Sequence, residues 1–95
     1  MSVTAVVLIK AKTREINALA TALAELDGVA DVYSVAGRYD LVAIVRAARN
    51  EDLADIVSDR MHALPGIEAS ETLISFRVYR RSDVEAGFGL GSEAG

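Results

Sequence analysis

Cysteine is absent from these 95 residues, and histidine and proline occur once each. Without cysteine the chain has no disulfide framework, no thiolate metal site and no cysteine nucleophile. One histidine cannot build a cluster of imidazole ligands around a metal. Disulfide scaffolds, zinc modules and cysteine-dependent enzymes are therefore excluded at the outset.

Positive charge is also scarce, with 10 Lys and Arg against 14 Asp and Glu and a formal net charge of −4. An acidic domain of this size is poorly suited to binding nucleic-acid phosphates, because that binding depends on a concentrated positive field. No apolar run approaches the ~18 residues of a membrane span, and the first residues lack the pattern of a secretion signal. We expect a cytoplasmic protein with no membrane partner.

Short β-branched runs alternate with helical patterns along the part of the chain that is rich in apolar residues. Runs typical of strands cover residues 3–9, 29–36, 41–45 and, with alternating apolar side chains at its end, 67–80. Apolar residues at helical spacing predict helices over about 14–26 and 50–63. We expect residues 1–80 to form one domain, followed by a flexible glycine-rich tail over 81–95.

The helix boundaries carry start and stop signals of their own. Thr13 and Asn50 are suited to cap the first turns of the two helices. Gly28 and the pair Pro65-Gly66 are suited to end them, since glycine adopts the left-handed conformation common after a helix.

The order β-α-β-β-α-β coincides with a weak internal repeat at an offset of about 38 residues, which aligns Leu26–Val29 with Leu64–Ile67. This pattern predicts an α+β fold of the ferredoxin-like kind. Its four-stranded antiparallel sheet has the first and third strands in the centre and both helices on one face.

The two central strands are apolar on both of their faces. Odd-numbered residues from Val3 to Ile9 form one set, and Val6 and Leu8 form the other. Only one set can lie under the helices, so a single copy would leave an apolar patch exposed. We expect a second copy to cover it, sheet against sheet, in a homodimer like a dimeric α/β barrel.

Candidates for catalysis or metal binding are few. His62 has no evident carboxylate partner in the sequence and is expected at the surface. Asp52, Asp55 and Asp59 recur at helical spacing but lie outside the buried stripe, which favours a solvated helix face. We expect no enzyme activity, no metal and no cofactor.

Two local features are candidates for a binding site. In the turn Gly37-Arg38-Tyr39-Asp40 the glycine leaves main-chain groups open, Tyr39 offers an aromatic wall, and Asp40 can accept hydrogen bonds. An ordinary hairpin turn, with Asp40 bonded to its own backbone, is the alternative. Ser70 and Thr72 share a strand face and can bind a carboxylate, or they simply reflect strand propensity.

These residues resemble the ligand-binding, oligomerising half of the Lrp/AsnC transcription regulators, the RAM domain, in its stand-alone form. The similarity extends from Val3 to Tyr79. Residues 29–41 are similar to the family stretch V-x-x-x-x-x-V-x-G-x-Y/F-D, and residues 64–72 to L-x-x-x-x-G-V-x-x-T-x-T. Ser70 departs from the family threonine but keeps the hydroxyl.

The resemblance implies sheet-to-sheet dimers that assemble further, for example into octamers. It implies an amino-acid effector bound between subunits, with Gly37, Arg38, Tyr39, Asp40, Ser70 and Thr72 as ligand-binding residues. Only two residues precede Val3, so we expect no DNA-binding half and no direct DNA binding, and full-length Lrp/AsnC regulators are candidate partners.

Two alternatives to a sensor stay open. One is a small monooxygenase-like enzyme of the dimeric α+β-barrel type, which needs a polar cleft between sheet and helices. The other is a purely structural oligomerisation module. An inward-facing His62 or Tyr33 that lines a sizeable pocket would favour the enzyme. Loss of the ligand response in Asp40→Ala with assembly intact would favour the sensor over the structural module.

Overall fold

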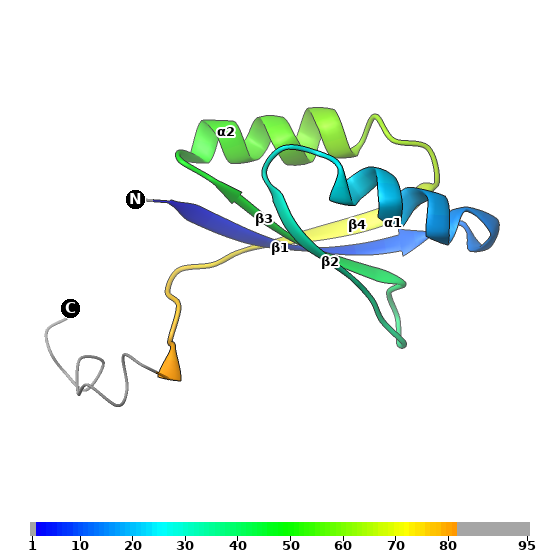
Figure 1. Cartoon of the computed structure of the whole chain (residues 1–95), viewed down its shortest axis with the longest axis horizontal. Coiled ribbons are helices and arrows are strands. Elements are labelled where there is room, and N and C mark those ends of the chain that lie inside the picture. Colours follow the sequence, from blue (N-terminus) through cyan, green and yellow to red (C-terminus); the bar gives the residue numbers. More distant parts are fainter. Residues whose placement is uncertain (1, 82–95) are drawn as a thin grey trace, which may run out of the picture.

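The computed structural model describes residues 2–81 (Figure 1). The predicted tail over 81–95 lies outside the described residues except for Arg81. The strands are β1 (Val3–Ala11), β2 (Val29–Ser34), β3 (Leu41–Ala47) and β4 (Ile67–Ile74). The helical elements are η1 (Thr13–Glu15), α1 (Ile16–Ala24), α2 (Asn50–Ala54) and its continuation η2 (Asp55–Met61).

The four strands form one antiparallel sheet in the order β2-β3-β1-β4, with the helices together on one face (Figure 1). In the register of the central pair, Val7 lies opposite Ala43 and Ile9 opposite Leu41. The predicted ferredoxin-like α+β arrangement, including its two central strands, is therefore confirmed.

The core lies between the sheet and the helices. Alternate residues of the two central strands are buried there, namely Ala5, Val7, Ile9, Leu41, Ala43 and Val45. Leu19 and Leu23 of α1 and Leu53, Ile56, Val57 and Met61 of α2 and η2 cover them. Alternation along the strands places these residues on one face, and the position of the helices makes it the buried one.

The other face of the sheet has no helix over it. The neighbouring side chains Val6, Leu8, Val42 and Ile44 alternate with the core residues and are only partly buried. Tyr33 of β2 and Leu73 of β4 lie in register beside them and are 52% and 46% exposed. We call these six residues the open sheet face.

The helix starts differ from the sequence expectation. Thr13 lies within the short 3₁₀ turn η1, and Asn50 is the first residue of α2; neither side chain caps a helix. The amide of Leu53 donates to the carbonyl of Arg49 at 3.1 Å, so Arg49 already occupies the cap position.

Two strands end earlier than their sequence pattern predicts. β2 ends at Ser34 and not at 36, and β4 ends at Ile74 and not at 80. Ile74 pairs with Ala5 near the start of β1, and the Ser75 amide makes the next bond, to the carbonyl of Thr4 at 2.9 Å. The ladder between the two strands stops there, and only Val3 of β1 lies beyond that bond.

Candidate functional site

Asp40 is held at the end of β1 by three contacts. Its amide donates to the carbonyl of Ile9 at 2.9 Å, and its Oδ2 accepts from the amide of Ala11 at 2.8 Å. Lys10 Nζ lies 3.9 Å from the same oxygen. The carboxylate therefore bonds to the backbone of another strand, next to the irregular pairing at Lys10 and Ala11, and not to its own turn.

Tyr39 links the loop between β2 and β3 to the far edge of the sheet. Its hydroxyl donates to Oε1 of Glu71 in β4 at 2.7 Å. This hydrogen bond raises the pKa of the Tyr39 phenol, because a phenolate could not donate it and would lie beside a carboxylate. The loop and β4 thus meet at one corner of the sheet, although β3 and β1 separate β2 from β4.

The bond predicts a pH-dependent effect of Tyr39→Phe. A raised pKa in the folded state means that the hydroxyl stabilises the fold below pH about 10, and that this contribution is lost as the pH rises through the folded-state pKa. We expect the variant to be slightly less stable than the parent at pH 7, with the difference closing in strong base. Urea unfolding at both pH values measures it.

Tyr79→Phe is the matched control, since it removes a hydroxyl from a ring that is 72% exposed. An equal stability difference for Tyr39→Phe at both pH values would show that the hydroxyl does not act through Glu71.

Gly37 and Arg38 form the exposed tip of the same loop. Gly37 has φ +138°, a conformation that favours glycine, and no atom lies within 4 Å of where a Cβ would stand. Arg38 is exposed beside it. Together with Lys10, Tyr39, Asp40 and Glu71, Arg38 defines what we call the corner site, which carries two cations and two carboxylates.

Ser70 and Thr72 lie on the opposite, helix-facing side of β4. They pair with the core residues Ile9 and Val7, whereas Glu71 between them pairs with Leu8 of the open sheet face. The Ser70 hydroxyl lies 2.9 Å from His62 Nε2, so His62 has a polar partner that its sequence context did not reveal.

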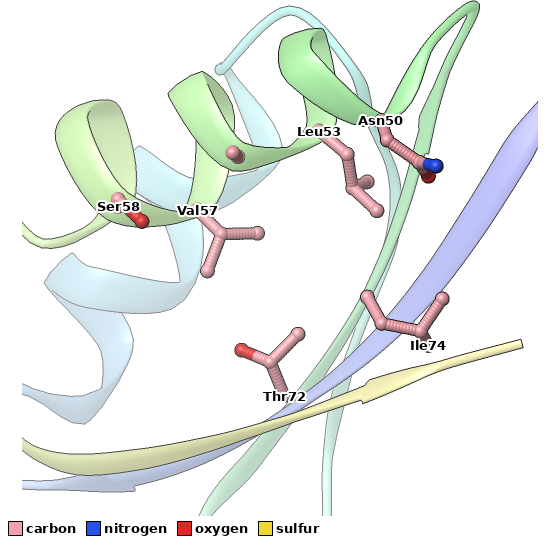
Figure 2. A pocket seen from close by; sticks show the side chains of 7 residues that line it. Asn50, Leu53, Val57, Ser58, Thr72 and Ile74 are labelled. Carbon is pink, nitrogen blue, oxygen red and sulfur yellow. The ribbon is translucent and has the colours of Figure 1, made fainter.

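Thr72 lines an open groove of about 440 Å³ between the helix and β4. Figure 2 shows Leu53 and Val57 pointing down toward Thr72 and Ile74, with Asn50 at one end. We call it the α2–β4 groove; its lining residues are Asn50, Leu53, Ala54, Val57, Ser58, Thr72 and Ile74. The lining is mainly apolar and carries no charged side chain.

One copy of the chain therefore separates the six predicted ligand-binding residues into two groups. Gly37, Arg38, Tyr39 and Asp40 belong to the corner site, while Ser70 and Thr72 lie on the other face of the sheet. That a shared site needs a second subunit stays a prediction.

Sequence reasoning did not select Lys10 and Glu71 as site residues. Both residues contact site residues that are distant in the sequence, and no local pattern reveals such contacts. The alternation at Ser70-Glu71-Thr72 was the one available signal, since it places Glu71 on the face opposite the two hydroxyls.

Within residues 2–81 no three His, Cys, Asp or Glu side chains gather in a way that could hold a metal ion. None of the helices in that range is long and apolar enough to cross a membrane.

Comparison with known families identifies this α+β domain. A model of the Lrp/AsnC ligand binding domain matches residues 4–84. The chain belongs to this family, as its resemblance at residues 29–41 and 64–72 implied.

The curated relatives that the chain matches are HTH-type transcription regulators. The HTH-type transcriptional regulator FL11 of Pyrococcus horikoshii is 28% identical over 81 residues, which are 85% of this chain and 53% of that protein. LrpA1 of Halobacterium salinarum is 44% identical over 48 residues, or 50% of this chain and 34% of that protein. The chain spans about half the length of the curated relatives it matches.

Among solved structures, TTHA0845 from Thermus thermophilus is 49% identical with a TM-score of 0.78, and the match covers 83% of this chain and 99% of that one. AsnC of E. coli, at 21% identity and a TM-score of 0.75, shares the fold; the match covers 82% of this chain and 54% of that one.

Proposed function

We propose that this chain is a non-enzymatic, stand-alone sensor domain that pairs through its open sheet face and binds a small amino acid at the corner site. It acts on transcription or metabolism by assembling with itself or with full-length relatives. The observation that carries the proposal is the gathering of two cations and two carboxylates around Tyr39 at one corner of an uncovered apolar sheet face.

The charges of the corner site suit an amino acid. Lys10 and Arg38 can pair with an α-carboxylate, and Asp40 and Glu71 can accept hydrogen bonds from an α-ammonium group. Lys10 is 46% exposed, and its contact with Asp40 is long at 3.9 Å. An exposed pair of this kind is weak, so a ligand can compete for either partner.

The open sheet face supports the proposed pairing. Tyr33, Val42, Ile44, Val6, Leu8 and Leu73 form an apolar surface that water would otherwise contact. Two copies can bury it against each other around a twofold axis, because the same patch is present on both. The ligand then shifts the assembly by binding one arrangement of subunits more tightly than another.

The interior between sheet and helices favours binding over the monooxygenase-like alternative. The buried residues of the described chain are all apolar, so that layer offers no polar cleft for chemistry. His62 is exposed at the end of η2, and Tyr33 lies on the open sheet face. Location in the cytoplasm stays a prediction.

Calorimetric titration with a panel of amino acids, with light scattering alongside, tests the proposal. We expect at least one amino acid to bind and to change the assembly mass, and Arg38→Ala to weaken that binding about tenfold. Arg14→Ala, another exposed arginine, is the control that should leave binding unchanged.

Absence of heat with every ligand would contradict the sensor and favour the structural module. Asp40→Ala is the less informative variant, because it also leaves the amide of Ala11 without its acceptor and so costs about 1–3 kcal/mol of stability by itself.

A further inference from the structure

The segment that follows β4 exposes a run of large apolar side chains. Phe76 is 97% exposed, Val78 51% and Tyr79 72%. Figure 1 shows this segment leaving the sheet on the side away from the helices. We call residues 75–79 the arm. Burying these side chains is favourable, so their exposure points to a surface that receives them.

The α2–β4 groove has the chemistry to receive the arm. Its walls are the aliphatic side chains Leu53, Val57 and Ile74, with the methyl groups of Ala54 and Thr72 between them (Figure 2). β4 is an edge strand, so in the described residues no strand pairs with its outer backbone. An extended segment with alternating apolar side chains can add to such an edge and place every second side chain in the groove.

The arm cannot reach the groove of its own chain without reversing direction. The Ser75 amide bonds to the carbonyl of Thr4 at 2.9 Å, so the arm begins by continuing the course of β4 away from the groove. No glycine or proline stands between Glu71 and Tyr79 to form a tight reversal. A second copy can present its groove without that constraint.

Charge supports the same pairing. Glu51, Asp55 and Asp59 are exposed, and each directly follows a residue that lines the groove. The arm contains Arg77, and Arg80 follows it. A basic segment beside an acidic rim is attracted and held in register.

We propose that the arm of one copy docks in the α2–β4 groove of a second copy, with Phe76 and Val78 inserted and the arginines beside the acidic rim. The exchange is reciprocal in a twofold pair. It concerns a surface separate from the open sheet face and from the corner site, and it does not depend on a ligand.

Disulfide trapping tests the docking directly, because the natural chain contains no cysteine. Isotope-labelled Phe76→Cys is mixed with unlabelled Ala54→Cys, and the disulfides are assigned by mass spectrometry. We expect a 76–54 link between two chains. Thr21→Cys, on the exposed side of α1, replaces Ala54→Cys in the control and should link far less.

Equal trapping at positions 54 and 21 would overturn the proposal. So would an intrachain link in the doubly substituted Ala54→Cys/Phe76→Cys chain at high dilution, since that would place the arm in its own groove.

Assembly strength gives a second measurement. We expect Phe76→Ser/Val78→Ser to raise the dissociation constant in sedimentation equilibrium about tenfold or more. Arg77→Glu/Arg80→Glu and Asp55→Lys/Asp59→Lys should each weaken assembly, and their combination should restore it. An unchanged constant in the apolar variant, or no restoration in the combined one, counts against the docking.

Discussion

The Val42→Asp variant is expected to sediment as a single 10.1 kDa chain at micromolar concentrations at which the parent chain forms pairs. Val42 lies in the centre of the open sheet face, between Leu8 of β1 and Tyr33 of β2. A carboxylate buried there without a partner costs about 3 kcal/mol, or roughly 100-fold in the dissociation constant. Aspartate is too short to reach solvent around the rim.

Val42 is only partly buried in a single copy, so the variant should still fold, which circular dichroism can verify. Ala18→Glu adds the same charge on the exposed side of α1 and should leave pairing intact. If the parent chain itself sediments at 10.1 kDa, pairing through the sheet is wrong. The docking of the arm is tested independently, by the engineered disulfide between positions 76 and 54.

Gly28→Ala is expected to lower the free energy of unfolding by about 2 kcal/mol. Gly28 has φ +94°, which L-residues adopt only at a cost, and a Cβ there would overlap Cδ1 of Ile56. Ile56 is 6% exposed and belongs to the core. Its methyl group therefore has little room to move away.

An Ile56→Val background separates the two parts of this penalty. Valine lacks the overlapping methyl group, so the cost of Gly28→Ala should fall to about 1 kcal/mol, the part due to backbone strain. The chain has no tryptophan, so urea unfolding is followed by circular dichroism at one fixed protein concentration. An unchanged cost in both backgrounds would contradict the overlap with Ile56.

The order of the elements could be predicted from the sequence, and so could the two sets of strand residues that share a face, but not which set the helices cover. Alternation along 3–9 and 41–45 places the residues that the structure buries, such as Val7 and Ala43, together in one of the two sets. The repeat places Gly28 and Gly66 at equivalent helix ends, and both have positive φ. These features follow from local periodicity, so neighbours in the chain are enough to determine them.

The residues of the corner site are brought together by contacts that no local sequence pattern shows. The bond from Ala11 to Asp40 spans 29 residues, and the bond from Tyr39 to Glu71 spans 32. Each exists because strand register brings those positions together.

Strand length likewise depended on the partner strand. The alternation of 75–79 is typical of a strand, yet β4 ends at Ile74, close to the end of β1, where only Val3 lies beyond the bond from Ser75 to Thr4.

Sequence periodicity by itself therefore determined which residues of this protein share a face and in what order its strands and helices follow, while the packing of the helices decided which strand face is buried. The tertiary structure decided which side chains meet at the corner site, which hydroxyls face the α2–β4 groove, and where the arm leaves the sheet. The physical reason is that burial follows the local pattern of apolar residues, whereas hydrogen-bond partners follow the register of strands distant in the chain.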